Sequence, residues 1–323
     1  MRRLRSRARA LWRDPISPSA YRTITAAALV ALVAIVVSGA AVRLTGSGMG
    51  CPTWPTCEEG SLVPRGATGA NGWIEFLNRV FTGLVSVAVA LAVLGARRRV
   101  PYRPELTRWA WGLVAGVVAQ ALLGGLVVVL HVSPVAVAGH YLLSAVLVAD
   151  AVILHHKASE PDGAVRRVAA ATPTLQRAAR LMVGLAGLVL VTGTLVTGSG
   201  PHGGDEAADR MPFAVVTVAR IHSGVVWTFL IVVLVVLRRA AAGDADPTTV
   251  GRGRVLALLI VAQGTLGYVQ YAAGVPEAMV AAHVLGSVLV WVAALRFHLA
   301  LVQPVAAPAE VAPVGVAVAP APS

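Results

Sequence analysis

The chain has 323 residues, of which 57% are hydrophobic, 13% charged and 5% aromatic, and its mean hydropathy is +0.75. Soluble domains carry about a quarter charged residues, so this composition excludes an ordinary water-soluble globule. It also excludes a disordered chain, which needs low hydrophobicity. The net charge of +12 would suit a nucleic-acid-binding protein, but the arginines lie in short clusters between apolar runs. The sequence therefore predicts an integral membrane protein with basic loops and no nucleic-acid partner.

Eight stretches of the chain are long and apolar enough to cross a bilayer. A membrane-spanning helix needs about 20 mostly apolar residues, because its backbone polar groups must bond within the helix. The first stretch is long and is not followed by a small-residue cleavage site and a soluble domain, so we expect a span rather than a cleaved signal peptide. The eight predicted spans are residues 23–42, 73–95, 109–130, 136–155, 180–198, 213–237, 255–273 and 277–299.

The distribution of Lys and Arg predicts the orientation of these spans. Cytoplasmic loops of membrane proteins carry an excess of Lys and Arg. Most of the 27 basic residues lie in the N-terminus and in the loops after every second span. The other face carries only Arg43, Arg65, Arg79, Arg210 and Arg220. We therefore expect a multi-pass protein of the plasma membrane, in contact with lipid, with both termini in the cytoplasm.

The two halves of the chain resemble each other. Gln120-Ala-Leu-Leu-Gly124 matches Gln263-Gly-Thr-Leu-Gly267 at an offset of 143 residues, and His140 matches His283 at the same offset. Upstream, Thr45-Gly-Ser-Gly48 matches Thr197-Gly-Ser-Gly200 at an offset of 152, so the first half has a longer outer loop. Each half has an even number of spans, so the repeats are parallel. The predicted fold is an all-α integral membrane protein, with eight transmembrane helices forming two parallel-repeat four-helix bundles.

This pattern divides the chain into five parts. A basic cytoplasmic N-terminus covers residues 1–22, and an N-terminal bundle with the outer cysteine loop covers residues 23–156. A cytoplasmic linker of residues 157–179 precedes the C-terminal bundle of residues 180–299. The remaining residues, 300–323, form an Ala- and Pro-rich tail without helical periodicity, which we expect to be disordered.

Three of the eight histidines stand out by their depth in the predicted spans. His140, His222 and His283 each lie one to three turns inside a span that enters from the outer face. A polar ring in hydrocarbon needs a partner, either a neighbouring helix or a ligand. The other five lie at span ends or in a loop, where an interfacial or solvated position explains them: His131, His155, His156, His202 and His298.

The intramembrane histidines of the second half are candidate ligands of a haem iron. A closed zinc site calls for four nitrogen or sulfur ligands, and the predicted spans contain no cysteine. Two imidazoles on facing helices, with small residues nearby, suit axial ligation of a porphyrin. We therefore expect His222 and His283 to hold a bis-histidine haem.

The first half has a different set of polar residues at the corresponding place. Counting back 143 residues from His222 gives Arg79, and Glu75 and Asn78 share a helix face beside it. Glu75 either forms an interfacial ion pair with Arg79 or faces the same pocket as His140. In the second case one half would hold a fully ligated haem, and the other an incompletely ligated one at which chemistry takes place.

An outer loop carries a cysteine motif. It reads Arg43-Leu-Thr-Gly-Ser-Gly-Met-Gly-Cys51-Pro-Thr-Trp-Pro-Thr-Cys57. Two cysteines on the oxidising side of the membrane can form a disulfide, although spacing alone leaves free thiols open. With Ile74-Glu-Phe-Leu-Asn-Arg79 and the contexts of His140, His222 and His283, this loop resembles the haem A synthase family of cytochrome oxidase assembly. The resemblance extends from about residue 21 to residue 299.

The resemblance implies a function and a set of site residues. The family oxidises the C8 methyl group of haem O to a formyl group by successive hydroxylations, with a haem b cofactor passing electrons. His222 and His283 would be the haem b ligands, Cys51 and Cys57 a disulfide pair, and Glu75 part of the substrate-haem site, where we expect it to be a catalytic residue that relays protons to the outer face. His140, Asn78 and Arg79 would belong to the substrate-haem site. Asn78 departs from the His found in many members, so the substrate haem would be five-coordinate through His140 or take another sixth ligand.

Other functions and partners stay open at this point. The chain could be a di-haem quinol-dependent electron carrier that modifies no haem, or a non-catalytic transporter or assembly factor whose histidines only pack helices. An electron acceptor, with a quinone as one candidate, and a complex with haem O synthase are further expectations.

Overall fold

The computed structural model describes residues 15–65, 69–162, 165–169 and 172–306. Most of the predicted basic N-terminus and residues 307–323 of the predicted tail lie outside this part of the chain. Within it, eight helices are long and apolar enough to cross a membrane, which confirms the predicted fold class.

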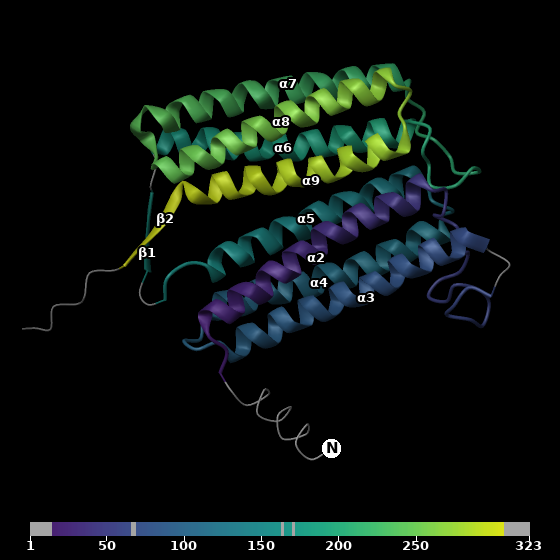
Figure 1. The fold of residues 1–323 in the computed structure, drawn as a ribbon, viewed down its shortest axis with the longest axis horizontal. Helices are drawn as coiled ribbons and strands as arrows, with labels where there is room; N and C mark the ends of the chain where they lie inside the picture. The colour runs from purple at the N-terminus through teal and green to yellow at the C-terminus, as the bar shows by residue number, and fades with distance from the viewer. Residues whose placement is uncertain (1–14, 66–68, 163–164, 170–171, 307–323) are drawn as a thin grey trace, which may run out of the picture.

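The eight helices form two four-helix bundles that lie side by side (Figure 1). Each bundle packs its first helix on its second and its third on its fourth. The first bundle contains α2 (Pro18–Leu44), α3 (Gly69–Arg98), α4 (Pro104–Val129) and α5 (Pro134–Ala158). The second contains α6 (Pro173–Ser199), α7 (Val215–Arg239), which continues into the short π-helix η1 (Ala240–Asp244), α8 (Pro247–Ala272) and α9 (Glu277–Ala300).

Six of the eight helices begin two to eight residues before the apolar stretches that predict them, all but α7 and α9. Five of them, α2, α4, α5, α6 and α8, have proline in the first turn. Proline suits this position because its missing N–H would be unpaired there in any case. Ser17 and Thr172 cap α2 and α6 by accepting a backbone hydrogen bond. Helix α6 consequently begins at Pro173, inside the predicted linker.

Two short strands pair beside the second bundle. β1 (Val165–Ala169) and β2 (Val302–Ala306) form an antiparallel ladder. β2 lies in the segment predicted as a disordered tail, so that expectation is wrong for residues 302–306. The segment lacks helical periodicity, as predicted, but its backbone finds a partner strand in the linker.

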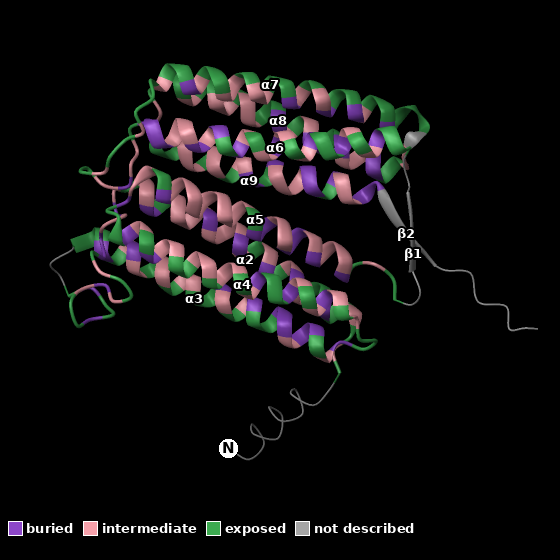
Figure 2. Cartoon of the chain, turned by 180° about the vertical axis from the view of Figure 1, so that it is seen from behind, coloured by how far each residue is buried: buried purple, intermediate pink, exposed green. Residues whose placement is uncertain are grey.

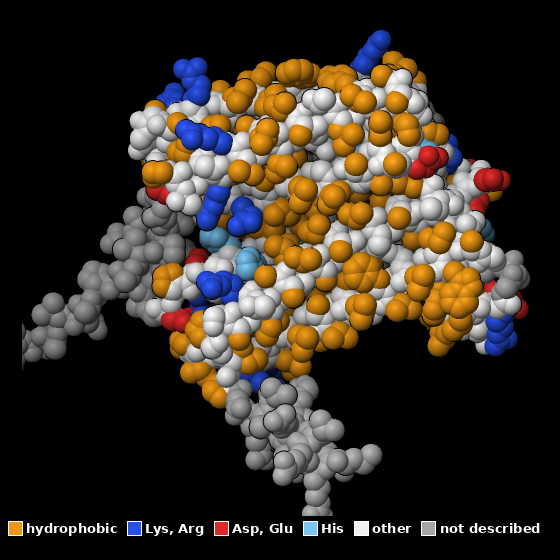
Figure 3. Space-filling model, viewed as in Figure 1, with side chains coloured by type: hydrophobic (Ala, Val, Ile, Leu, Met, Phe, Trp, Pro, Cys, Tyr) orange, Lys and Arg blue, Asp and Glu red, His pale blue; other side chains and the backbone are white. Residues whose placement is uncertain are grey.

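The two ends of the double bundle differ. We call the end with the disulfide loop, residues 45–65, the disulfide end, and the end with β1, β2 and the start of α2 the terminal end (Figure 1). Both hydrophobic cores occupy the terminal half of their bundle. Figure 2 shows buried residues denser toward the terminal end on helices such as α3 and α9. Most of the Lys and Arg side chains visible in Figure 3 gather near that end, while hydrophobic side chains cover the flanks of the helices.

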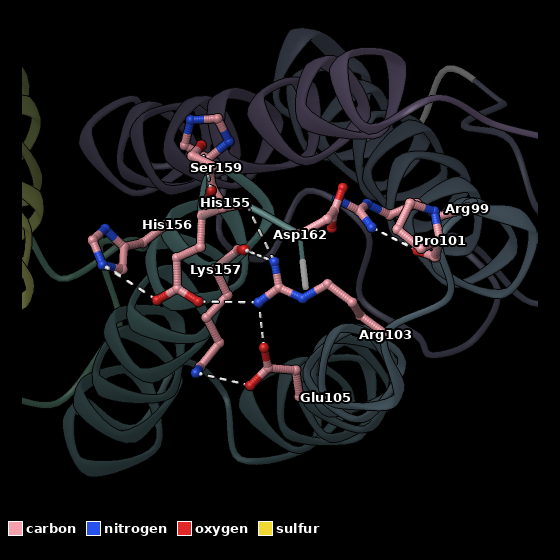
Figure 4. A network of polar contacts seen from close by, with 10 residues as sticks. Arg99, Pro101, Arg103, Glu105, His155, His156, Lys157, Ser159 and Asp162 are labelled. Atoms are coloured by element: carbon pink, nitrogen blue, oxygen red, sulfur yellow. Dashed lines mark hydrogen bonds and ion pairs between the residues drawn. The ribbon is translucent and has the colours of Figure 1, made fainter. Parts of the chain in front are cut away.

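A network of ion pairs ties the terminal end of the first bundle together (Figure 4). Arg103 pairs with Glu105 and, at 3.0 Å, with Glu160, and Lys157 pairs with Glu105 at 3.3 Å. Burial lowers the tendency of Arg103 to carry charge, but its bonds to Glu105 and Glu160 outweigh this, so its pKa is raised. The α3–α4 connection is thereby fastened to the end of α5.

Hydrogen bonds also join the two bundles. The Tyr141 hydroxyl of α5 lies 2.8 Å from Ser287 Oγ of α9, and Trp291 Nε1 donates to the Ala145 carbonyl at 2.9 Å. Tyr141 follows His140 directly, and Ser287 is one turn beyond His283. The interface therefore connects the helices that carry the candidate ligands of the two halves.

Candidate functional site

His140 and His283 have the same local structure in the two bundles. In the first, Gln120 Nε2 donates to the His140 carbonyl at 3.1 Å; in the second, Gln263 Nε2 donates to the His283 carbonyl at 2.6 Å. Each imidazole also lies against a glycine of the preceding helix. A Cβ atom on Gly124 would come within 3.3 Å of His140 Cε1, and one on Gly267 within 3.0 Å of His283 Cε1. The repeat noted in the sequence thus places both rings in equivalent, tightly framed positions.

His222 completes a pair with His283 in the second bundle. The two imidazoles come from α7 and α9 of the same bundle, and each lies against a glycine of the preceding helix. His222 Nδ1 is 3.0 Å from Thr192 Oγ1 of α6, and a Cβ atom on Gly193 would come within 3.4 Å of His222 Cε1. The Thr192 hydroxyl also lies 3.0 and 3.1 Å from the carbonyls of Leu188 and Val189, to which it can donate. In that arrangement Thr192 Oγ1 accepts from His222 Nδ1, and His222 Nε2 keeps its lone pair for a ligand.

Three helices of each bundle bury no residue around these histidines, whereas α6 buries Leu190, Thr192 and Thr194 there. No residue of α7 from 219 to 228 is buried, and none from 261 to 287 on α8, α9 and their connection. The first bundle has the same feature, because no residue is buried in 76–84 of α3, 114–124 of α4 or 137–146 of α5. We call these two regions the sparse layers. They contain the candidate histidines, and tight packing of large side chains resumes only toward the terminal end.

The imidazole nitrogens also fit a metal ligand. His140 Nδ1 and His283 Nδ1 are buried and make no hydrogen bond within the described residues. Buried polar atoms without a partner are rare and call for an explanation. Among the described residues there is no cluster of three or more His, Cys, Asp or Glu that could hold a metal ion. Paired imidazoles beside glycines, in a layer with few buried side chains, are a donor set that suits the iron of a porphyrin.

Asn78 occupies the place in the first bundle that His222 occupies in the second. Ser38 Oγ of α2 donates to Asn78 Oδ1 at 2.7 Å, just as Thr192 of α6 contacts His222. Gly39 follows Ser38 as Gly193 follows Thr192. The constant offset of 143 residues would have placed Arg79 there, so the register of α3 against α7 differs by one residue from that of α5 against α9.

Glu75 and Arg79 hold the disulfide loop. Glu75 is buried; its Oε2 accepts from Cys51 N at 2.7 Å, and its Oε1 accepts from Arg79 Nη2 at 2.6 Å. Arg79 also donates to the carbonyls of Cys51, Thr53 and Thr56. The ion pair weighed in the sequence is therefore present, and both of its members contact the loop.

The loop itself is closed by a disulfide and covers the first bundle. Cys51 and Cys57 are bonded to each other and fully buried. The ring of Trp54 lies against Gly125, where a Cβ atom would come within 2.7 Å of it. Gly125 is the neighbour of Gly124, which lies against His140. The loop therefore contacts α4 directly beside the first sparse layer.

Several residues of this arrangement were not recognised from the sequence. They are the residues that bond to the site from other helices: Ser38, Thr192, Gln120, Gln263 and Trp54. A signal was present, because a Ser-Gly or Thr-Gly pair occurs in the first span of each half and both glutamines lie in the matched segments. Of the remaining histidines, His155 Nδ1 lies 3.0 Å from Thr25 Oγ1 and His202 Nε2 lies 2.9 Å from the Val275 carbonyl. His298 Nδ1, near the terminal end of α9, is also buried without a hydrogen bond within the described residues.

Comparison with known proteins gives consistent matches. The family described as cytochrome oxidase assembly protein matches residues 22–202. A protein of Shouchella clausii named Heme A synthase is 34% identical over 136 residues, 42% of this chain and 44% of that protein. Another of that name, from Lysinibacillus sphaericus, is 31% identical over 137 residues, again 42% of this chain and 44% of the relative. The chain thus matches less than half the length of these curated relatives.

Proposed function

Because the chain belongs to the cytochrome oxidase assembly protein family, we propose that it is a haem A synthase, which oxidises the C8 methyl group of haem O to a formyl group. The observation that carries the proposal is the matched pair of sparse layers, each framing an imidazole with a glutamine and a glycine. The relatives named Heme A synthase support the same activity.

The second bundle is the proposed haem b site. His222 and His283 would hold the iron of haem b, His222 through Nε2 because its Nδ1 contacts Thr192. Thr192 would fix the tautomer of His222, in the way that a second partner orients a metal-ligating histidine. Haem b, when bound, supplies an iron that takes up and gives off single electrons.

The first bundle is the proposed site of the substrate, haem O. His140 would hold it from α5, while Gln120 and Gly124 fix the position of the His140 backbone and ring. The disulfide loop would shield this site from water at the disulfide end, with Trp54 over α4. Asn78 and Arg79 of α3 would complete its surroundings.

Glu75 has two proposed roles. Its contacts with Cys51 and Arg79 support a positioning role, in which the carboxylate keeps the disulfide loop over the site. The sequence also predicts a proton relay from the methyl-derived carbon to the outer face. Conversion of a methyl and one water to a formyl group releases four protons and four electrons, so a carboxylate near the site would have protons to accept.

The surroundings of the reaction are proposed as well. The terminal end, with its many basic residues, would face the cytoplasm of a bacterial cell, as the distribution of Lys and Arg predicts. The electrons would pass to an acceptor of the quinone class, and haem O would be delivered by haem O synthase.

Reconstitution with haem O tests the activity. The purified chain, supplied with haem O, oxygen and a quinone, should yield haem A in an acidic acetone extract. His140→Ala should abolish this product while the haem b spectrum stays as in the wild type. Two bound haems, quinol oxidation and no haem A would instead identify a di-haem electron carrier. A purified chain that takes up no haem under any loading condition would identify a protein whose histidines only pack helices.

A further inference from the structure

The two bundles carry different side chains at one equivalent position: Asn78 in the first and His222 in the second. In the second bundle, α7 places His222 opposite His283, and Thr192 of α6 anchors the imidazole. In the first bundle, α3 places Asn78 at the equivalent position, and Ser38 of α2 anchors the amide. The anchoring hydroxyl is thus shared, while the group that it anchors changes from an imidazole to a carboxamide.

The shorter side chain leaves room beside α2. A Cβ atom on Gly193 would meet the His222 ring at 3.4 Å, whereas a Cβ atom on Gly39 would meet nothing within 4 Å. The space that the imidazole fills beside Gly193 is therefore open beside Gly39. An amide at this position does not reach as far toward the opposite helix as an imidazole does, and amides are weak ligands of haem iron.

The hydrogen bond to Ser38 orients the amide of Asn78. Ser38 Oγ is 2.7 Å from Asn78 Oδ1 and 3.1 Å from the Ile35 carbonyl, and the shorter contact takes the hydroxyl proton. Asn78 Oδ1 is then the acceptor, and the Nδ2 hydrogens make no hydrogen bond within the described residues. The free end of the amide is consequently a hydrogen-bond donor within the first sparse layer.

We infer that the first-bundle porphyrin is held by His140 alone, and that Asn78 donates a hydrogen bond to a small ligand bound on the opposite side of its iron. The inference rests on the proposed function, since it requires a porphyrin in the first bundle. Asn78 acts as a positioning residue for that ligand, and Ser38 acts through it. The second bundle, closed by His222, takes no such ligand.

Carbon monoxide is the probe, because it binds ferrous haem only where a coordination position is open. The full chain is purified with both porphyrins, reduced with dithionite and titrated with carbon monoxide. We expect half of the porphyrin to bind it. Asn78→His should close the first site, so that carbon monoxide binding is lost and a second low-spin signal appears. Asn78→Ala should keep the binding, raise the C–O stretching frequency and speed dissociation about fivefold, the effect of one lost hydrogen bond.

Matched variants separate this inference from the proposed function. Ser38→Ala should shift the C–O stretch in the same direction as Asn78→Ala but less, whereas Thr192→Val should leave that band in place. Two porphyrins per chain with no carbon monoxide binding, or an unchanged C–O stretch in Asn78→Ala, would overturn the inference and leave the proposed function standing. A single porphyrin per chain, or carbon monoxide binding that survives His140→Ala, would overturn the first-bundle site and the inference with it. The low-spin signal of the second bundle reports that each variant is folded.

Discussion

The two bundles share a scaffold and differ in what they place on it. Both frame one histidine with a glutamine and a glycine, and both leave a sparse layer around it. They differ at Asn78 and His222, and in their loops at the disulfide end, where only the first bundle has a disulfide. A repeated fold therefore provides two similar frames, and under the proposed function a few substitutions would suit one to hold a cofactor and the other to bind a substrate.

The largest expected effect on the spectrum comes from removing His283, the second bundle's equivalent of His140. His283→Ala should abolish the low-spin haem b signal of the reduced protein, because the second porphyrin loses an axial ligand and its frame. His298→Ala is the matched control, since His298 lies on the same helix near the terminal end. We expect an unchanged reduced spectrum for that control. Retention of the low-spin signal in His283→Ala would refute the ligand assignment.

The next variant converts the second bundle into a copy of the first. His222→Asn should keep the porphyrin on His283 but open its other side, so that both porphyrins of the reduced protein bind carbon monoxide. The absorbance change on titration, compared with that of the wild type, measures this. If the second porphyrin of His222→Asn stays low-spin and unreactive, His222 is not its ligand and the comparison between the bundles fails.

The sequence predicted the scaffold better than the difference between the halves. Hydropathy gives the eight spans, and the matched offsets give the parallel repeat, because both signals run through many residues. The internal repeat alone did not give the register of Asn78, since the offset changes along the chain with each loop insertion. Counting from His222 therefore landed on Arg79, whereas the family resemblance and the contacts with Ser38 and Thr192 both point to Asn78.

Other features depend on partners far along the chain. The β1–β2 pairing joins segments more than 130 residues apart, each with only five residues, too short for a visible alternation. The start of α6 at Pro173 lies outside the apolar window, because capping and not hydropathy sets a helix end. The contacts of Glu75 with the backbone of the disulfide loop likewise depend on loop geometry that residue types do not encode.

The loops at the disulfide end offer the third test. Arg79→Ala removes four hydrogen bonds to carbonyls of the first loop and leaves buried Glu75 without its ion pair, which should cost about 3 kcal/mol. Arg210→Ala is the control in the second bundle, because Arg210 is exposed and bonds only to carbonyls of its own loop. Thermal midpoints in detergent, and the rate at which a mild reductant opens the Cys51–Cys57 disulfide, measure the effect. Equal losses in both variants would show that the first loop is not specially anchored.

The two proposed roles of Glu75 are separated by Glu75→Gln. A pure proton relay would lose haem A formation and keep the loop as stable as in the wild type. A positioning residue would instead expose the disulfide to reductant in step with the loss of product. We expect the second outcome, because both carboxylate oxygens are engaged by the loop and by Arg79.

At the terminal end the bundles fasten equivalent helices by different means. The first bundle uses the ion-pair network of Arg103 at the start of α4 (Figure 4). Arg103→Ala should destabilise the protein by about 2 kcal/mol, because it removes two ion pairs that are largely shielded from water. Arg238→Ala, an exposed arginine at the same end of the second bundle, should change the stability by less than about 0.5 kcal/mol. A thermal midpoint for Arg103→Ala as high as that of Arg238→Ala would contradict a stabilising network.

The second bundle starts α8, the counterpart of α4, with a capping residue instead. Asp246 accepts hydrogen bonds from Thr249 Oγ1 at 2.6 Å and from the backbone N–H of Thr248 at 2.9 Å. The Thr249 bond in particular lowers the pKa of Asp246 in the folded protein. A carboxyl with a lowered folded pKa stabilises above its unfolded pKa of about 4, and this stabilisation is lost as the pH falls through the folded pKa. Asp246→Ala should therefore cost about 1 kcal/mol at neutral pH and less in acid. Asp246→Asn can still cap the helix and should remove only the pH dependence of the stability. If the stability lost in Asp246→Ala is the same at pH 7 and at pH 3, the charge of the cap does not contribute.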